Sequence, residues 1–462
     1  MNQPSDTEAN GPLLSRRTWQ HTISNVSAVA ACAFIAPGLW AAMNGLGGAG
    51  SADPYYVNAA NSVIFCLQLV ICIFGSTLIA KIGLRWAFAF GMTGFPLYAA
   101  SVYCNVKYGN TWFLMAACAI DGITSGIFWL TEGAVVLAYP EKNRRGKYLA
   151  YWLASRIVGQ MVGGAVTLGV NATHREAGHI SVETYLVFIS IQVLGPFVAS
   201  LLSPPHKVQR ADHTPVTIDI RQKLSRELRT TWEVLCRKEI LLLLPMMFQS
   251  VFSEAFFSTY NTTYFTVRSP TLSSLVASGS NSHTRTVIAF IVIYAFEAAL
   301  YIYAMIMTNR YEGMETKPVF DWTDDGFGQG VCAYILMLVG FNLMYDYFYW
   351  LVGCVNKNGA DLVRLSAIIR GIESAGQAIS YGISSISSFP LSGAVAVKMS
   401  FFAACIIPAA FVIFKVGIID GVKAHDIVQD ENLNMQSPGT ERSSDIGMDK
   451  RVGGAVHVDH QS

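Results

Sequence analysis

The sequence predicts an all-α, polytopic membrane protein. Of its 462 residues, 52% are hydrophobic and 14% are charged, whereas soluble domains carry about 25% charged residues. The apolar residues recur in eleven runs of membrane-spanning length, which is about 20 residues. A soluble protein does not offer eleven such runs, so we expect lipid to cover much of this apolar surface.

The composition also excludes several classes of protein. The net charge of +1 leaves no basic face, so we expect no nucleic-acid partner. The nine cysteines have neither CxxC nor metal-ligand spacing, so we expect no metal. No Walker, GxSxG or other enzyme signature occurs, and we therefore expect neither an enzyme nor a cofactor.

The expected spans fall into two groups. The first six occupy residues 22–45, 56–80, 87–106, 112–139, 147–170 and 184–203, and five more occupy 240–265, 286–308, 329–354, 362–388 and 392–416. We expect five regions: a cytoplasmic N-terminal tail at 1–20, an N-terminal helical bundle at 21–203, a cytoplasmic linker at 204–239, a C-terminal bundle at 240–416 and a disordered tail at 417–462. Six spans before a linker and about six after it are the layout of a major facilitator transporter.

Basic residues in the short loops set the orientation. Lys and Arg gather before the first span and after the second and fourth spans, at Arg16, Arg17, Lys81, Arg85 and residues 142–147. Because cytoplasmic loops are enriched in basic residues, the N-terminus is expected in the cytoplasm. The sequon Asn171-Ala-Thr173 then lies outside, which makes Asn171 a glycosylation candidate.

An ordered set of motifs resembles the fungal branch of the uncoordinated-ninety-three-like family, a subgroup of the major facilitator superfamily. The motifs include Pro37-Gly-Leu-Trp-Ala-Ala-Met-Asn44, Trp129-Leu-Thr-Glu132, Phe265-Thr-Val-Arg268, Phe320-Asp-Trp322, Tyr349-Trp-Leu-Val-Gly353 and Arg370-Gly-Ile-Glu-Ser-Ala-Gly376. The resemblance implies twelve helices in two pseudo-symmetric halves around a central cavity. It implies no substrate, because the family contains regulators or trafficking partners of other membrane proteins as well as fungal members described as transporters.

The chain departs from the family pattern at two places. The superfamily loop after the second helix reads Gly-x-x-x-Asp-Arg/Lys-x-Gly-x-Arg. Here Lys81, Gly83 and Arg85 remain but the acidic residue is absent, so the cytoplasmic gating loop is incomplete. The eighth helix is expected just after Arg268, yet the eighteen residues to Arg285 include a proline and several serines. We therefore expect this helix to be truncated, in the protein itself or through a mis-spliced message.

Ionisable residues within spans are functional candidates, because each costs at least about 2.5–3.5 kcal/mol at bilayer depth. Asp121 and Glu132 lie three turns apart on the fourth span, about 16 Å along one face. Arg156 on the fifth span lies at the depth of Glu132, which predicts a Glu132–Arg156 pair. Such a pair serves either as a protonation-linked gate or as a static ion pair that fixes helix packing.

The C-terminal half supplies the remaining candidates. Arg370 and Glu373 are spaced i,i+3 and are expected to pair. Glu254 and Asp346 are expected across the cavity, whereas Glu297 has no partner nearby in sequence. In the other half, Trp40 and Asn44 follow Pro37-Gly38, a candidate hinge, and are expected to line the outer mouth of the cavity.

These observations predict a secondary transporter that moves a small solute by alternating access between the two bundles, with a proton as the coupling ion. The alternative is a regulator or trafficking partner that transports nothing and binds another membrane protein. Either way, the lipid bilayer is a partner of this multi-pass integral membrane protein.

Overall fold

A computed structural model describes residues 21–45, 54–141, 144–171, 181–210, 216, 224–264, 285–320, 323–355 and 362–435. Over these ranges the chain is helical apart from short turns and irregular connections, with an isolated bridge between His21 and Gln209. The all-α prediction is confirmed. Residues 1–416 form one compact unit and residues 417–462 a second.

The helices before the linker correspond to the first six expected spans. They are α1 (Thr22–Ala33), η2 (Phe34–Gly38), α2 (Leu39–Gly45), α3 (Pro54–Ile82), α4 (Leu84–Gly91), α5 (Gly94–Tyr108), α6 (Thr111–Ala138), α7 (Arg145–Asn171), α8 (Val182–Gln192) and α9 (Leu194–Ala199). The first, third and sixth spans are thus interrupted. In the first, the π-helical turn η2 contains Pro37, whose ring nitrogen cannot donate to the α-helical ladder.

The later helices correspond to the linker and the last five expected spans. They are η4 (Pro205–Lys207), α10 (Leu224–Leu235), α11 (Lys238–Ser250), α12 (Ser253–Tyr264), α14 (Arg285–Glu312), α15 (Phe327–Val355), α16 (Leu362–Ser384) and α17 (Leu391–Met435). Because α17 continues to Met435, the expectation of a disordered tail from residue 417 is corrected for residues 417–435. The expected truncation of the eighth helix lies outside the described residues, up to the start of α14.

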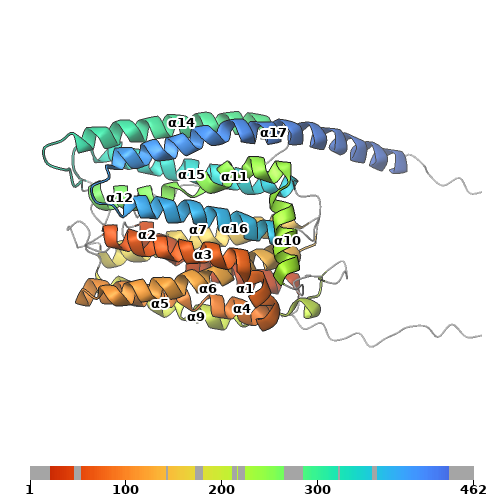
Figure 1. The fold of residues 1–462 in the computed structure, drawn as a ribbon, viewed down its shortest axis with the longest axis horizontal. Coiled ribbons are helices and arrows are strands. Elements are labelled where there is room, and N and C mark those ends of the chain that lie inside the picture. Colours follow the sequence, from red (N-terminus) through yellow and green to blue (C-terminus); the bar gives the residue numbers. More distant parts are fainter. Residues whose placement is uncertain are drawn as a thin grey trace, which may run out of the picture. The chain divides into compact units, whose positions relative to one another are not determined.

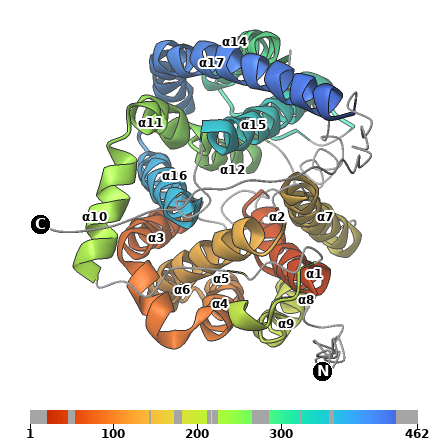
Figure 2. The ribbon, with the colours of Figure 1, turned by 90° about the vertical axis from the view of Figure 1, so that its right-hand side faces the viewer.

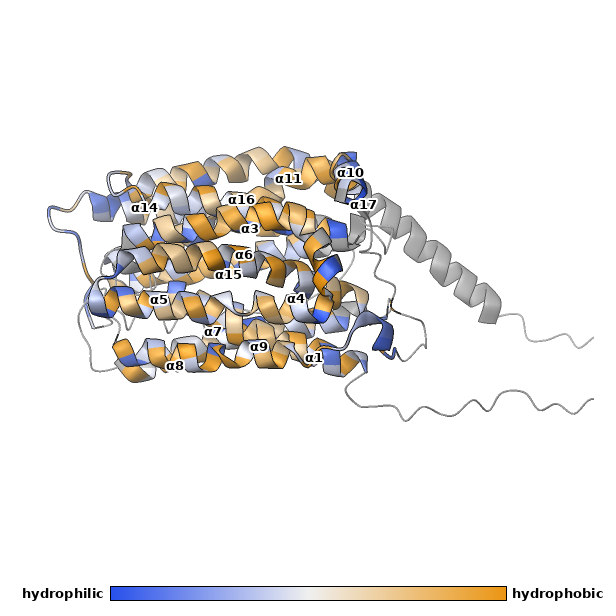
Figure 3. Cartoon of the chain, turned by 60° about the horizontal axis from the view of Figure 1, so that its bottom comes forward, coloured by the Kyte–Doolittle hydropathy of each residue, from blue (hydrophilic) through white to orange (hydrophobic). Residues whose placement is uncertain are grey.

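The helices have the length and composition of membrane spans. Within the described ranges, eight helical segments are long and apolar enough to cross a bilayer. Figure 1 shows the long helices of residues 22–416 side by side, with α10 lying across their ends. In Figure 3 hydrophobic residues dominate the middle of the helices and hydrophilic residues gather near their ends. The protein is therefore an integral, multi-pass membrane protein.

The apolar cores follow the division into two halves. One cluster of buried side chains is built from helices before the linker and two from helices after it. A further cluster combines helices before the linker with Val208 and Val216 of the linker and Ala367 of α16. A fifth cluster joins the halves through Phe65 of α3, Ala255 of α12, and Ala378 and Tyr381 of α16. Figure 2 shows α3 and α16 neighbouring one another where the halves meet. This contact forms one wall of the site described next.

The linker helix α10 is attached to both halves. It packs against α3 on one side and against α11 and α16 on the other. Its Glu227 carboxylate accepts two hydrogen bonds from Arg364 of α16, at 2.8 and 3.0 Å, and both side chains are buried. The sequence did not single out this pair, because its partners are 137 residues apart.

Candidate functional site

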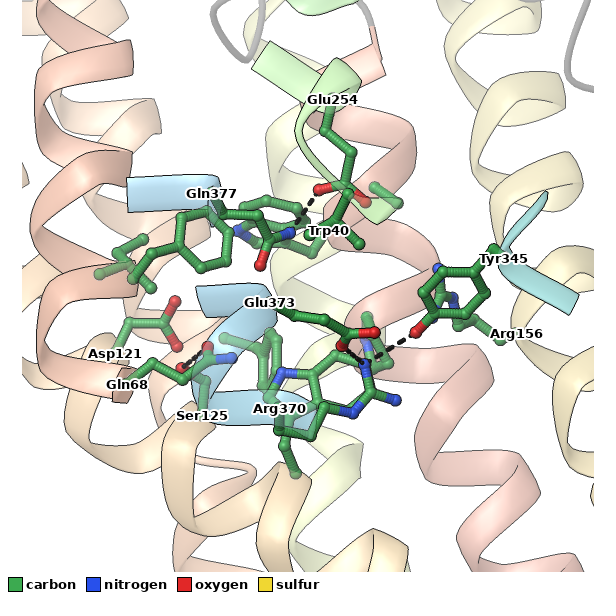
Figure 4. Close-up of a pocket in the computed structure, with 17 residues that line it drawn as sticks. Trp40, Gln68, Asp121, Ser125, Arg156, Glu254, Tyr345, Arg370, Glu373 and Gln377 are labelled. Carbon is green, nitrogen blue, oxygen red and sulfur yellow. Dashed lines mark hydrogen bonds and ion pairs between the residues drawn. The ribbon is translucent and has the colours of Figure 1, made fainter. Parts of the chain in front are cut away.

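A cavity lies at the centre of residues 1–416, between the two halves. Its volume is about 60 Å³, and it is lined from both halves of the chain. Figure 4 shows its polar residues pointing toward one another from α2, α3, α6, α7, α12, α15 and α16. The labelled lining residues are Trp40, Gln68, Asp121, Ser125, Arg156, Glu254, Tyr345, Arg370, Glu373 and Gln377.

Arg370 is the best-anchored charge of the cavity. Its guanidinium donates to the Glu373 carboxylate at 3.1 Å and to the Tyr345 hydroxyl at 2.9 Å. The guanidinium carbon also lies 4.1 Å from the centroid of the Trp129 ring. The predicted Arg370–Glu373 ion pair is therefore confirmed, and contacts with α6 and α15 hold it at the interface between the halves. A planar guanidinium suits this combination of hydrogen bonding and ring stacking.

The expected Glu132–Arg156 pair is wrong. Trp152 of α7 donates its indole N–H to Glu132 Oε1 at 2.7 Å, and Oε2 of this fully buried carboxyl has no hydrogen-bond partner. Arg156 instead faces the other half, where its guanidinium carbon lies 5.5 Å from the centroid of the Tyr345 ring. The residue of α7 that meets Glu132 is thus Trp152, one turn before Arg156, and the two expected partners contact different helices.

Asp121 and Glu132 therefore have different surroundings, although they lie on one helix. Asp121 lines the cavity, whereas Glu132 does not. The Asp121 side chain is 1% exposed and its Oδ1 has no hydrogen-bond partner. Gly94 of α5 gives it room, since a Cβ atom there would lie 2.5 Å from Oδ1.

Glu254 lies on the opposite wall and is held by an amide that the sequence reasoning missed. The side-chain N–H of Gln377 donates to Glu254 Oε2 at 2.6 Å. A second missed amide, Gln68 of α3, donates to Ser374 of α16 at 2.9 Å and accepts from Ser125 at 3.3 Å. Amides within apolar runs were the available signal, because a neutral polar side chain at bilayer depth also needs a partner.

Polar and aromatic contacts close the cavity at the end where α3 begins and α16 ends. Asn58 of α3 donates to the Thr259 hydroxyl of α12 at 3.1 Å, and Ser62 of α3 donates to the Ala378 carbonyl at 2.8 Å. The rings of Phe65 and Tyr381 stack with their centroids 5.3 Å apart. These contacts join helices of the two halves, so the structure is closed at this end.

Trp40 and Asn44 are separated by the structure. Trp40 lines the cavity, and its ring lies edge-on to Phe65 with 6.0 Å between centroids. Asn44 is buried behind it, where it accepts hydrogen bonds from Asn61 at 2.8 Å and Tyr98 at 3.3 Å. Asn44 therefore supports the helices of the first half and does not line the cavity.

The other predicted residues lie away from the cavity or outside the description. Lys81 is exposed and Gly83 has φ +87°, a left-handed conformation that glycine adopts without strain between α3 and α4. Arg85 stacks over the ring of Trp86 at 5.3 Å. The side chains of Asp346 and Asn171 lie outside the described residues. Among the described side chains no group of three or more His, Cys, Asp or Glu has the geometry of a metal site.

The sequence of the chain is similar to a known protein family and to several proteins of fungi and plants. The family described as "Ion channel regulatory protein UNC-93" matches residues 50–278. A "Notoamide biosynthesis cluster protein O'" of Aspergillus versicolor is 69% identical over 449 residues, which cover 93% of this chain and 97% of the relative. An UNC93-like protein of Schizosaccharomyces pombe is 25% identical over 395 residues, covering 80% of this chain and 77% of the relative.

Comparison with solved structures identifies the fold. A crystal structure of a POT family transporter in complex with a thioalcohol-conjugated peptide superposes with a TM-score of 0.56. The alignment covers 85% of this chain and 96% of the transporter, with 10% sequence identity. At such low identity the likeness concerns the fold alone, which is the major facilitator fold that the sequence predicted.

Proposed function

Since the chain belongs to the UNC-93-like family and has the major facilitator fold, we propose that it is a secondary transporter that moves a small solute by alternating access. The observation that carries this proposal is the central cavity, which takes charged and aromatic side chains from both halves of the chain. Rocking of the halves, residues 21–203 against residues 240–416, would therefore remake the walls around a bound solute.

The contacts at the closed end suit a reversible closure. They comprise single hydrogen bonds such as Asn58 to Thr259 and one ring stack, Phe65 on Tyr381. A hydrogen bond contributes about 0.5–1.5 kcal/mol and an aromatic pair about as much beyond its buried area. A few such contacts are strong enough to favour one state and weak enough for solute binding to reverse the preference.

The lining favours an amphipathic solute that carries a planar group and both hydrogen-bond donors and acceptors. Trp40 and Trp129 offer aromatic faces, Arg156 and Arg370 are cations, and Asp121 is an acceptor with an unpartnered oxygen. The Aspergillus relative is named for notoamide biosynthesis. We therefore place notoamides and their biosynthetic intermediates first among the solutes to be tested, with a proton as the coupling ion.

The second candidate function is that of a regulator or trafficking partner of another membrane protein. It is favoured by the family description, which names ion-channel regulation. This function would not require a solute in the cavity. It predicts that a second membrane protein purifies with the chain in stoichiometric amount while no solute crosses the membrane.

A counterflow screen in proteoliposomes tests the two functions. Vesicles that hold the full-length protein are loaded with unlabelled compound and scored for accumulation of the labelled compound. Arg370→Lys keeps the charge but loses the planar stack on Trp129, so we expect uptake to fall at least tenfold. The matched control is Arg229→Lys on α10, whose side chain is 82% exposed and should leave uptake unchanged. Equal uptake by both variants would refute the proposed site, and absence of flux with a co-purifying partner would support the regulator.

A further inference from the structure

A second buried charged cluster lies in the C-terminal half, outside the cavity. It contains Lys398 of α17, Glu297 and Tyr301 of α14, and Gln249 of α11; we call it the Lys398 cluster. Lys398 is 4% exposed and Glu297 2% exposed, and neither lines the cavity. Because each ionised group costs at least about 2.5–3.5 kcal/mol at bilayer depth, two of them in one apolar core indicate a function.

Lys398 binds the end of a broken helix. Its ammonium group donates to the backbone carbonyl of Gln249 and to Gln249 Oε1, the latter at 2.6 Å. Gln249 belongs to the last turn of α11, and helical structure resumes only at Ser253. The carboxyl end of a helix carries a partial negative charge, and discontinuous helices of transporters use such ends to hold coupling cations. In this protein a lysine side chain supplies the positive charge.

Glu297 is close to this cation but is not neutralised by an ion pair. No Glu297–Lys398 ion pair is found among the described residues, although the two charges interact electrostatically. Glu297 Oε1 is buried without a hydrogen-bond partner. It is directed at Gly340 of α15, where a Cβ atom would lie 2.5 Å from this oxygen. The structure thus keeps space for a carboxyl oxygen that is free to bind a proton.

Among the described residues, few other titratable groups lie near the cluster. Three of them are Tyr301 and Tyr294 of α14 and Cys405 of α17, and both tyrosines interact with Glu297. The fourth is Glu254 of α12, a cavity residue that interacts electrostatically with Lys398. Among these groups Glu297 is the carboxyl that lies outside the cavity and has an oxygen without a partner. A proton that enters the cluster is therefore expected on Glu297.

The break between α11 and α12 connects the cluster with the cavity. Gln249 before the break contacts Lys398, whereas Val251 within the break and Glu254 after it line the cavity. Glu254 is held from the opposite side by Gln377 of α16. A displacement of Lys398 would therefore move the end of α11 and, through four residues of backbone, the cavity wall.

We propose that Glu297 and Lys398 form a proton-binding site that controls the break between α11 and α12. Glu297 takes a proton from water on one side of the membrane, which removes its attraction for Lys398 and lets α17 and the end of α11 shift. Release of the proton to the other side restores the negative charge of Glu297 and its attraction for Lys398. This inference rests on the proposed transport function, because it locates the coupling proton outside the solute cavity.

Two measurements on the full-length protein in lipid nanodiscs test the site without a solute. In infrared spectra recorded against pH, Glu297→Gln should remove one carboxylic-acid C=O band, and Lys398→Gln should move its midpoint by more than one pH unit. Glu233→Gln, on the exposed side of α10, is the matched control and should leave the band intact. An unchanged band in Glu297→Gln would overturn the proposal.

The second measurement follows the break itself. Val251→Cys, with the exposed Cys66, Cys236 and Cys332 replaced by serine, is labelled with a maleimide at a series of pH values. We expect the labelling rate to change at least fivefold across the infrared midpoint, and to lose this dependence in Glu297→Gln. A pH-independent labelling rate together with a normal infrared band would show that protonation of Glu297 does not move the break, and would overturn the proposed control. Protonation without any solute flux would instead refute only the proposed transport function.

Discussion

The crossing of the first span with α7 gives the sharpest test of how helix packing positions the cavity. At this crossing Gly38 of η2 faces Gly159 of α7. A Cβ atom at Gly159 would lie 2.5 Å from the Phe34 carbonyl oxygen and 3.1 Å from the Gly38 Cα atom. Ordinary contacts of this kind begin near 3.4 Å, so Gly159→Ala must separate the two backbones by about 0.9 Å, the difference between 3.4 and 2.5 Å.

The free-energy change can be set against a matched substitution. Overpacking of this size costs about 1–3 kcal/mol, whereas alanine in place of glycine stabilises a helix by about 1 kcal/mol. Gly169→Ala on the same helix introduces the same methyl group with no atom within 4 Å. It should therefore show the stabilisation from helix propensity without any cost of overpacking. We expect Gly159→Ala to be less stable than Gly169→Ala by about 1–3 kcal/mol.

The separation of η2 and α7 in Gly159→Ala should also change the wall of the cavity. Arg156 is one turn before Gly159 and faces Tyr345 of the other half, so displacement of α7 should weaken solute binding at least fivefold. Thermal unfolding in nanodiscs measures the stability, and counterflow measures the binding. Equal stability of Gly159→Ala and Gly169→Ala would refute the packing argument, because the two variants differ only in their surroundings.

Three further outcomes follow from particular contacts. Phe65→Ala removes the stack on Tyr381, worth about 0.5–1.5 kcal/mol beyond its buried area, and should increase maleimide labelling of Val251→Cys from the closed end; unchanged labelling would show that this stack does not contribute to closure. Glu227→Gln breaks a buried bidentate ion pair and should lower the free energy of unfolding by about 3–5 kcal/mol, whereas Glu227→Leu with Arg364→Met should recover most of it; failure of the double variant to recover stability would contradict the desolvation argument. The double variant Glu132→Arg with Arg156→Glu should lose activity, because Trp152 then loses its hydrogen-bond acceptor. Full activity of this variant in counterflow would support a direct Glu132–Arg156 ion pair instead.

The sequence predicted those features that depend on one helix at a time. Each expected apolar run overlaps helices of the structure, and eight helical segments of the described ranges have the length and composition of a membrane span, since insertion into lipid depends on the composition of each segment alone. The Arg370–Glu373 pair was predicted because both residues lie on one helix at i,i+3 spacing. Pro37 likewise marked the position where the first span is interrupted. Composition did not determine where α17 ends, because helix continues through the polar residues up to Met435.

Contacts between helices were decided by the tertiary structure. The helical rise suggested Arg156 as the partner of Glu132, but the actual partner, Trp152, depends on the rotation and crossing of α6 and α7, which no local pattern records. The same holds for Gln377 on Glu254 and for Lys398 on the end of α11, whose partners are 123 and 149 residues apart. In a bilayer the apolar residues identify the spans, but lipid and protein offer them nearly equal surroundings. Close packing and polar pairing across helices therefore select the partners, and these depend on every helix at once.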